Sequence, residues 1–357
     1  MKHDFLLYGA NGYTGRLIAR YAERYSLRPL LAGRNGNQLK ALAAETGYDY
    51  VVVDLNDTDG LRHILNASQV VLHAAGPFDV TAKPMVEACI ATNTHYLDIN
   101  GDTNVFEMIR RYDQAATAAG VMLLPGAGFD VVPTDCMAAL LKQQMPDAAS
   151  LKLAFVTTGG GLSHGTAKTM INSLGAGGAR RKNGEIIKVP LGEHGLTITV
   201  NNQDHFVMSI PWGDVSTAWF TTGIPNIETF TAVPKKVYYL LKFQSAFNWL
   251  LRTGLVRNRL RTALAKRPAG PADAQRKKAR AMIWGQAKNQ DGETITATAS
   301  GPEGYTLTAL STLIMVRKIL EGKFKPGYQT PATAYGHELV SEIPGYNKPV
   351  FSTIRRA

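Results

Sequence analysis

The sequence lacks the features that would assign it to several common classes of protein. Its 357 residues include only two cysteines, so no disulfide framework is predicted. No apolar run approaches the length of a transmembrane helix, and the first predicted strand begins almost at the N-terminus, so we expect neither a spanning segment nor a signal peptide. Repeats and low-complexity tracts are absent. A hydrophobic content of 45% and a charged content of 19% are typical of a globular protein, and the length allows two domains.

Two kinds of catalytic motif are also missing. The histidines show no spacing typical of metal ligands, so no metal site is predicted; they include His3, His63, His73, His95 and His194. Short-chain dehydrogenases need a Tyr-x-x-x-Lys pair beside the cofactor, and none occurs near the fifth predicted strand. Tyr238 and Lys242 have this spacing, but they lie far beyond the sixth predicted strand. We therefore interpret that pair as coincidence.

Negative charge is nearly absent from one segment. The chain has a net charge of +11, and residues 233–280 hold thirteen lysines and arginines but one acid, Asp273. Apolar residues recur there at helical spacing, at Val237, Leu240, Leu241, Phe247, Leu251 and Leu255. A cationic amphipathic helix can contact an anionic membrane or an acidic carrier protein. The alternative is a helix that packs on its own domain with one solvated face. No nucleic-acid-binding motif accompanies the charge, so no nucleic acid partner is predicted.

Glycine is abundant at the start of the chain, in a pattern that indicates nucleotide binding. An apolar strand ending at Tyr8 is followed by Gly9-Ala10-Asn11-Gly12-Tyr13-Thr14-Gly15 and then by an apolar helical pattern. Gly9 permits the turn out of the strand, Gly12 lets the backbone approach a pyrophosphate, and Gly15 lets the helix pack closely. The helix N-terminus favours the phosphate charge. The spacing G-x-x-G-x-x-G is less common than G-x-G-x-x-G, so its strand–helix context carries the inference.

An arginine after the second predicted strand indicates which dinucleotide is bound. The strand of residues 29–33 ends at Gly33-Arg34, where NAD enzymes place an acid that binds the ribose 2′-hydroxyl. The guanidinium of Arg34 instead suits a 2′-phosphate, and Asn35 and Asn37 offer uncharged donors. The predicted cofactor is therefore NADP(H).

Strand and helix signals alternate through the first 140 residues. The predicted strands are uniformly apolar, which is typical of a parallel sheet covered on both faces; they cover residues 5–8, 29–33, 50–54, 70–75, 95–99 and 121–125. The predicted helices after the first cover residues 38–46, 58–65, 83–92 and 104–119. This order predicts an α/β, Rossmann-type, doubly wound parallel sheet.

The pattern changes after Pro133. Helices are predicted over residues 134–144, 166–174 and 305–320, and strands with alternating polarity over residues 150–158, 196–200, 205–210, 218–222, 281–288 and 294–300. The alternation predicts a second, α+β domain with a mainly antiparallel sheet.

Several motifs resemble one known family. They are Gly9–Gly15, Ala32-Gly33-Arg34, Ala75-Gly76-Pro77-Phe78, residues 95–102, residues 126–135, Gly165-Thr166 and residues 301–305. The chain resembles the saccharopine dehydrogenase-like NADP-binding oxidoreductases, in particular the branch of the trans-acting enoyl reductases of polyketide-lipid pathways. It departs from the family pattern in two places. The family usually has Gly-Glu where this chain has Gly101-Asp102, and Ser-Gly is common where this chain has Ser163-His164.

The resemblance implies a domain division and a set of cofactor-binding residues. Residues 1–135 would form the Rossmann domain, completed by residues 303–357, and residues 136–302 would form the substrate or partner domain. Because ligands lie at the carboxyl ends of parallel strands, the predicted NADP(H) site contains Gly9, Asn11, Gly12, Tyr13, Thr14, Gly15, Gly33, Arg34, Asp54, Ala75, Gly76, Pro77 and Phe78.

The candidate catalytic residues are His164, Lys168 and Asp130. Asp130 follows the sixth strand, while His164 and Lys168 are four residues apart at a predicted helix start and could act as acid and charge stabiliser. The alternative for the second pair is a helix capped by Ser163 with a solvated lysine. Other carboxylates, such as Asp98 and Asp135, have plausible structural roles.

These observations predict an NADP(H)-dependent oxidoreductase that reduces an enoyl, keto or imine group of a lipid-like or carrier-bound substrate. One alternative is an NADP-binding sensor or membrane-associated scaffold without turnover. A second is an amino-acid dehydrogenase of the saccharopine type, for which Arg180 and Arg181 offer spare cations. The expected location is the cytoplasm, and the sequence is compatible with peripheral contact at the inner face of a membrane. It is also compatible with a homo-oligomer.

Overall fold

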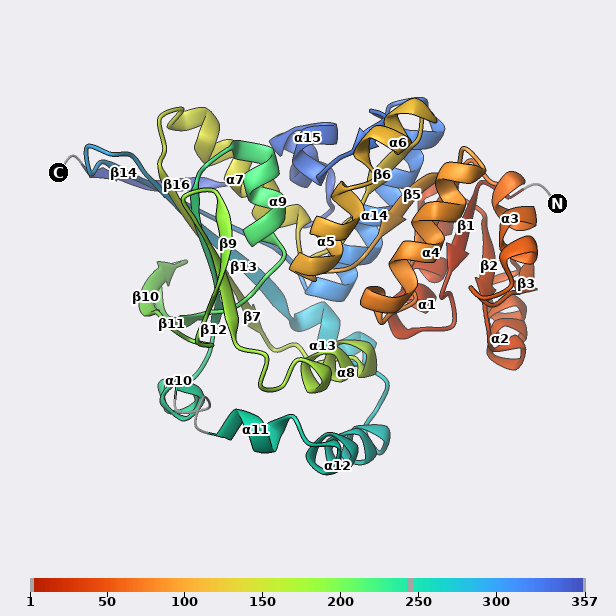
Figure 1. Cartoon of the computed structure of the whole chain (residues 1–357), viewed down its shortest axis with the longest axis horizontal. Coiled ribbons are helices and arrows are strands. Elements are labelled where there is room, and N and C mark those ends of the chain that lie inside the picture. Colours follow the sequence, from red (N-terminus) through yellow and green to blue (C-terminus); the bar gives the residue numbers. More distant parts are fainter. Residues whose placement is uncertain (1–2, 243–246, 356–357) are drawn as a thin grey trace. The chain divides into compact units, whose positions relative to one another are not determined.

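The computed structural model describes residues 3–242 and 247–355, which form two compact units (Figure 1). The first comprises Met1–Val132 and Gly304–Pro344, and the second comprises Pro133–Glu303 and Gly345–Ala357. Each unit has its own sheet, and the chain passes from one unit to the other three times.

The first unit contains a parallel sheet. Among the described residues it has seven strands in the order β15-β6-β5-β4-β1-β2-β3. Their bounds are β1 Phe5–Tyr8, β2 Pro29–Gly33, β3 Tyr50–Val52, β4 Val70–His73, β5 His95–Asp98, β6 Met122–Leu124 and β15 Gly327–Tyr328. Every pairing is parallel. The predicted Rossmann architecture is confirmed, and β15 adds a strand that the sequence pattern did not indicate.

Helices cover the faces of this sheet. They are α1 Tyr13–Ala22, η1 Glu23–Tyr25, α2 Gly36–Thr46, α3 Thr58–Asn66, α4 Phe78–Ala91, α5 Thr103–Arg110, α6 Asp113–Ala118, α14 Gly304–Leu320, α15 Pro331–Tyr335 and η3 His337–Glu342. The strands β1, β4 and β5 are buried along their whole length, which explains their lack of polar alternation. The apolar helix α14 packs against α1 and is buried over most of its length.

The second unit contains a mixed, mainly antiparallel sheet. Among the described residues it has nine strands, with the main path β10-β11-β12-β7-β13-β14-β16 and a β8–β9 hairpin joined to β12. The bounds are β7 Ser150–Thr158, β8 Gly178–Lys182, β9 Glu185–Val189, β10 Gly195–Val200, β11 Gln203–Ser209, β12 Asn226–Ala232, β13 Arg280–Lys288, β14 Thr294–Pro302 and β16 Val350–Arg355. Only β12 and β7 pair in parallel within that described sheet. Its core includes Phe230, Trp284 and Val207.

The helices of the second unit include the basic segment. They are α7 Val132–Gln144, α8 His164–Asn172, α9 Asp214–Thr222, α10 Lys235–Lys242, α11 Asn248–Leu251, α12 Gly254–Ala265 and α13 Asp273–Lys278. The predicted apolar spacing from Val237 to Leu255 does not form one helix, because α11 ends at Leu251 and α12 begins at Gly254 after its cap Thr253. Residues 243–246 lie outside the described part of the chain.

Four predictions about the fold are wrong. Residues 218–222 belong to helix α9 and not to a strand, because Gly223 ends the helix in the left-handed region at φ +69°. The predicted helix 104–119 is divided into α5 and α6. Helix α4 begins five residues earlier than expected, directly at Phe78. Finally, residues 345–355 do not complete the Rossmann unit, because β16 adds to the second sheet by pairing with β14.

Candidate dinucleotide-binding site

Three loops approach one another closely at the carboxyl ends of β1, β2 and β4. Gly9 has φ +86°, and a Cβ atom there would lie 2.6 Å from the backbone nitrogen of Ala75. A Cβ atom on Gly15 would lie 2.8 Å from the Cα of Ala10, and one on Gly33 would lie 2.8 Å from Oδ1 of the neighbouring loop's asparagine. Backbone contacts therefore require glycine at positions 9 and 15, as the sequence pattern predicted, whereas Gly33 makes room for the side chain of Asn11.

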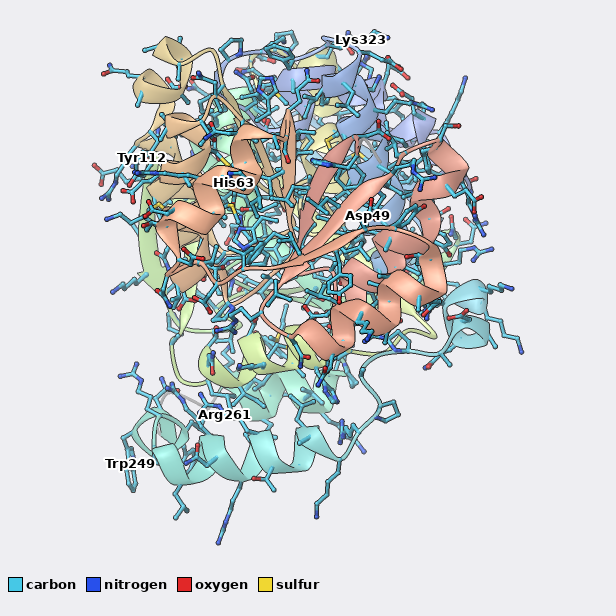
Figure 2. All side chains as sticks on the ribbon, turned by 90° about the vertical axis from the view of Figure 1, so that its right-hand side faces the viewer. Asp49, His63, Tyr112, Trp249, Arg261 and Lys323 are labelled. Atoms are coloured by element: carbon cyan, nitrogen blue, oxygen red, sulfur yellow. The ribbon has the colours of Figure 1, made fainter. Side chains whose placement is uncertain are left out.

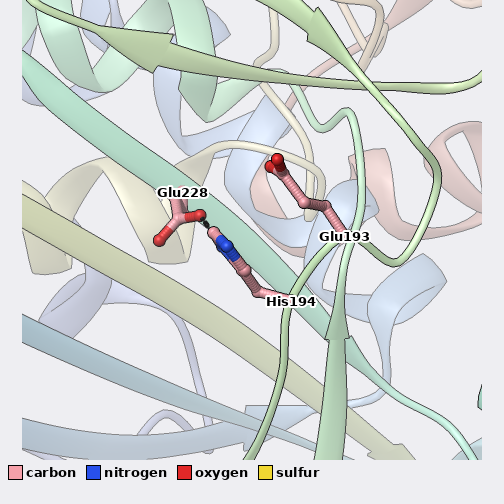
Figure 3. A group of neighbouring side chains, drawn as sticks. All are labelled: Glu193, His194 and Glu228. Carbon is pink, nitrogen blue, oxygen red and sulfur yellow. Dashed lines mark hydrogen bonds and ion pairs between the residues drawn. The ribbon is translucent and has the colours of Figure 1, made fainter.

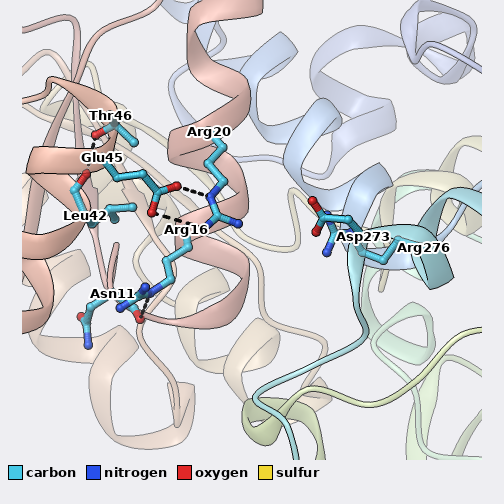
Figure 4. A network of polar contacts seen from close by, with 8 residues as sticks. All are labelled: Asn11, Arg16, Arg20, Leu42, Glu45, Thr46, Asp273 and Arg276. Carbon is cyan, nitrogen blue, oxygen red and sulfur yellow. Dashed lines mark hydrogen bonds and ion pairs between the residues drawn. The ribbon is translucent and has the colours of Figure 1, made fainter.

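The N-terminus of α1 is suited to an anion. No side chain caps the helix at Gly12, and the N–H groups of residues 13–15 lie in its first turn, at the positive end of the helix dipole. The side chain of Arg16 donates to the backbone oxygen of Asn11 at 3.1 Å (Figure 4). Asn11 in turn donates to Gln38 Oε1 at 3.0 Å. Side chains of α1 and α2 thus hold the loop in place. The N–H groups at the start of α1 have no side-chain cap.

Arg34 lies where a 2′-phosphate would be recognised. It follows β2, and its side chain is 75% exposed. Its Nε atom lies 3.8 Å from Oδ2 of Asp54, which follows β3 and also accepts hydrogen bonds from Asn56. The carboxylate therefore restrains the guanidinium loosely and leaves its donors accessible. Of the two neighbouring asparagines that the sequence suggested as donors, Asn35 caps α2 by accepting from Gln38.

The loop after β4 is held by side chains that do not occur in its motif. The carbonyl oxygen of Ala75 accepts hydrogen bonds from Thr81 Oγ1 at 2.7 Å and from His73 Nε2 at 3.2 Å. The Phe78 ring packs edge-on against the His73 ring, with centroids 5.3 Å apart. Burial lowers the pKa of His73 to about 3, so its imidazole is neutral at physiological pH. The Gly76-Pro77-Phe78 turn is thereby fixed beside the glycine-rich loop.

A buried carboxylate organises the next two strand ends. Asp98, at the end of β5, accepts hydrogen bonds from Tyr96 Oη at 2.7 Å and from the backbone nitrogen of Gly126 at 2.8 Å. Both nitrogens of Asn100 also donate to it, and the Tyr96 hydroxyl lies 3.4 Å from His73 Nδ1. Burial raises the pKa of Asp98 despite these donors. The network joins the loops after β4, β5 and β6.

The loop of residues 126–130 is seated on α14. The backbone nitrogen of Phe129 donates to Thr308 Oγ1 at 2.9 Å, and Ser311 Oγ donates to the carbonyl oxygen of Ala127 at 2.7 Å. A Cβ atom on Gly128 would lie 2.8 Å from the Thr308 side chain, so the close approach requires glycine. The small residues of this loop are explained by its contact with α14, a helix far away in the sequence.

Asp130 is the acid in this loop whose protonation is most altered. It packs against Gly101, where a Cβ atom would lie 2.7 Å from its Oδ2 atom. Burial raises the pKa of Asp130 to about 7. A carboxyl group that gains and loses a proton near neutral pH, at the carboxyl ends of parallel strands, is suited to proton transfer.

We expect Asp130→Asn to change the pH dependence of folding stability. A carboxyl group with a raised pKa in the folded state favours folding at low pH and loses this contribution as the pH rises toward 7. Relative to the variant, the wild-type protein should therefore lose about 2 kcal/mol of unfolding free energy between about pH 4 and about pH 8, since the side chain is half-buried. Urea denaturation at several pH values measures this. Asp59→Asn, on the exposed face of α3, is the control, and an equal slope in both variants would contradict the assignment.

The other two candidate catalytic residues belong to the second unit. His164 begins α8, and its Nε2 atom donates to the carbonyl oxygen of Arg267 at 2.8 Å. Ser163 caps the helix by accepting from the backbone nitrogen of Thr166 at 3.2 Å, and Lys168 is exposed. These contacts agree with the alternative of a helix capped by Ser163 with a solvated lysine, and His164 anchors a loop. A catalytic role for the pair stays a prediction.

The structure also brings together a histidine and two carboxylates that the sequence spacing did not indicate. Glu193, His194 and Glu228 could offer ligands to a divalent cation, since one atom of each lies within 4.8 Å of the others (Figure 3). His194 Nδ1 and Glu228 Oε1 are 2.5 Å apart. Arg180 Nε lies 3.0 Å from Glu193 Oε2, so the charge of this glutamate is already balanced by a cation. We interpret the cluster as an ion-pair network.

The chain is similar to known oxidoreductases in sequence and in fold. Residues 5–124 match the family described as the saccharopine dehydrogenase NADP binding domain. The trans-acting enoyl reductase of Mycobacterium leprae is 32% identical over 140 residues, which cover 37% of this chain and 34% of the relative. A probable mitochondrial saccharopine dehydrogenase-like oxidoreductase of Arabidopsis thaliana is 29% identical over 150 residues, covering 37% and 33%. The structure of apo saccharopine dehydrogenase from Saccharomyces cerevisiae is similar to this one with a TM-score of 0.67 at 15% sequence identity. The match covers 98% of this chain and 100% of the yeast chain.

The loops, the uncapped helix and the exposed arginine define a dinucleotide-binding domain of the Rossmann class. Residues 5–124 match the saccharopine dehydrogenase NADP binding domain, in agreement with the resemblance predicted from the motifs. The matches to the two named relatives span about a third of their length. The structural likeness to the yeast enzyme, at its low identity, extends the shared fold to the second unit. The residues present fit NADP, since glycines leave room for the pyrophosphate and Arg34 offers a cation for the 2′-phosphate.

Sequence reasoning missed the residues that hold the site together. The side chains of His73, Thr81 and Arg16 hydrogen-bond to loop carbonyl oxygens, and Tyr96 hydrogen-bonds to Asp98; none of the four belongs to the predicted cofactor-binding motifs. One signal was available: Tyr96 and Asp98 are two residues apart in a strand and therefore share a face. The β4–β5 register then places His73 opposite Asp98.

Proposed function

We propose that this protein is an NADP(H)-dependent oxidoreductase that reduces an enoyl, keto or imine group of a lipid-like or carrier-bound substrate. The observation that carries the proposal is the exposed Arg34 beside the uncapped N-terminus of α1, in a domain of an NADP-binding family. The names of the two relatives, both oxidoreductases, support the reaction class, and the enoyl reductase supports the choice of substrate.

Reduction of a double bond needs a hydride and a proton. NADPH, when bound, supplies the hydride, and the proton comes from a protein group or from water. Asp130 is the strongest candidate in the first unit, because its pKa of about 7 leaves a substantial protonated fraction at neutral pH. Asp98 is less suited, since its oxygens already accept hydrogen bonds from Tyr96, Asn100 and Gly126.

The amino-acid dehydrogenase alternative is weaker. It needs free cations for the substrate carboxylates, and two arginines of β8 were the candidates. Arg180 forms an ion pair with Glu193 at 3.0 Å. Arg181 is buried, donates to the carbonyl oxygen of Val215 at 2.8 Å, and lies over the Trp219 ring at 4.3 Å. Both guanidinium groups thus have structural partners.

The location follows from the same proposal. Within the described ranges, no helix is both long and apolar enough to cross a bilayer. We propose a cytoplasmic enzyme that contacts membranes only peripherally.

The test combines binding with turnover. The wild-type protein is titrated with NADPH and NADH by fluorescence, and NADPH oxidation is then followed with enoyl, keto and imine substrates, including acyl thioesters. We expect tighter binding of NADPH and oxidation with at least one class. Asp130→Asn should leave NADPH binding unchanged and lower turnover by about a hundredfold.

The outcomes separate the proposal from its alternatives. Stereospecific transfer of the labelled hydride from NADPH to the carbon of one of these substrates, with NADP+ as the other product, would identify a reductase. Tight NADPH binding with neither turnover nor hydride transfer would favour the sensor or scaffold. Turnover restricted to an imine formed with an amino acid would favour the saccharopine-type reaction.

A further inference from the structure

The basic segment exposes large apolar side chains. Within residues 235–267, here called the cationic arm, Leu240 is 74%, Trp249 71%, Leu255 65% and Tyr239 59% exposed. Four such side chains on α10, α11 and α12 are unusual for a surface in contact with water alone, because the hydrophobic effect disfavours their hydration. Figure 2 shows the side chains of these helices, with Trp249 and Arg261 labelled.

The same arm carries charge of one sign. It contains nine lysines and arginines and no acid. The acid that follows it, Asp273, forms an ion pair with Arg276 of the same short helix at 2.9 Å (Figure 4). Lys236, Arg259 and Lys266 are exposed, and Arg259 and Lys266 share the outward face of α12 with Leu255. On α12, apolar and cationic side chains therefore share one face.

The arm is fixed to the second unit by backbone contacts. Arg252 donates to the carbonyl oxygen of Gly175 at 2.7 Å, and Arg257 donates to that of Leu174 at 3.1 Å. These oxygens follow the C-terminus of α8, where the helix dipole favours cations. Tyr238 of α10 is buried against the Phe206 ring at 5.0 Å. The exposed groups are thus presented by a supported scaffold.

We propose that the cationic arm docks this protein on the surface of an anionic lipid bilayer. Tryptophan and tyrosine rings favour the interface between headgroups and acyl chains, leucines insert below it, and lysine and arginine pair with lipid phosphates. An acidic carrier protein would satisfy the charge, but it offers no comparable apolar phase for side chains on three helices. The proposal concerns where the protein lies and is independent of its turnover.

Vesicle binding tests the arm directly. The full chain is sedimented with vesicles of phosphatidylcholine alone or mixed with phosphatidylglycerol. We expect binding to the anionic vesicles that weakens with salt. The double variant Arg259→Glu and Lys266→Glu should lower partitioning by roughly a hundredfold. The double variant Trp249→Ser and Leu240→Ser should lower it by roughly tenfold and remove part of a blue shift in tryptophan fluorescence.

The control places the same charge change outside the arm. Arg62→Glu with Lys323→Glu reverses two exposed cations of the first unit and should leave partitioning nearly unchanged. Unfolding curves of all variants exclude loss of fold. The proposal is overturned if neutral and anionic vesicles bind alike, if the control matches the arm variants, or if the arm binds a purified acidic acyl carrier protein while vesicles are not bound.

Discussion

Replacement of Arg34 by glutamate should abolish the preference of this protein for NADPH. The guanidinium lies at the end of β2, is largely exposed, and is restrained only by Asp54 at 3.8 Å. Loss of a charge-assisted contact, together with repulsion of the 2′-phosphate, should cost about 3 kcal/mol, which is roughly a hundredfold in the NADPH dissociation constant. Affinity for NADH, which lacks that phosphate, should change little.

A fluorescence titration of both cofactors measures the ratio. Arg62→Glu, an exposed change of equal charge on α3, controls for the net charge of the unit and should leave the ratio as in the wild type. If Arg34→Glu retained the full preference for NADPH, another cation would have to bind the 2′-phosphate, and Arg16 beside the Asn11 loop would be the next to replace.

Asp98→Asn should be among the most destabilising single substitutions in the first unit. The buried carboxylate accepts from Tyr96, from Asn100 and from the backbone of Gly126. An amide offers one acceptor oxygen and places N–H donors against donors, so buried groups lose their partners. We expect a loss of about 3 kcal/mol in unfolding free energy, measured by urea denaturation with NADPH absent.

Asp102→Asn is the matched control for this substitution. Asp102 caps α5 by accepting from the backbone nitrogen of Asn104 at 2.8 Å, and asparagine caps helices equally well. Its effect should stay within about 0.5 kcal/mol. Equal losses in both variants would show that the Asp98 network contributes little beyond ordinary loop contacts.

The sequence predicted the first sheet well and the second less well. Strands such as β1 and β4 are apolar throughout, and helical spacing separates them, so their order follows from local pattern. The alternation of apolar and polar residues over 218–222 predicts a strand, yet these residues form the end of helix α9, whose C-cap is Gly223. Strands β15 and β16 depend on partners far away in the sequence, which no local pattern reports.

The candidate site was predictable where backbone geometry dictates the residue. Gly9 and Gly15 were recognised because close loop contacts leave no room for a side chain. Arg34 was recognised from its position after a strand. The support of the Ala75 carbonyl by His73 and Thr81 was not, because hydrogen bonds between loops depend on register and not on spacing along the chain. The raised pKa of Asp130 likewise depends on burial against Gly101.

The interleaved course of the chain limits how this protein can be divided. The first unit needs α14 and the residues that follow it, since Phe129 and Ala127 bond to that helix, while β16 returns to the second sheet. A contiguous N-terminal fragment would lack α14 and would expose the apolar surface of α1 that this helix covers. Removal of the last strand would leave β14 as an unpaired sheet edge prone to intermolecular pairing. Exchange of substrate specificity between homologues is therefore best made by transplanting residues 133–303 together with the segment from residue 345 onward, with residues 1–132 and 304–344 left in place.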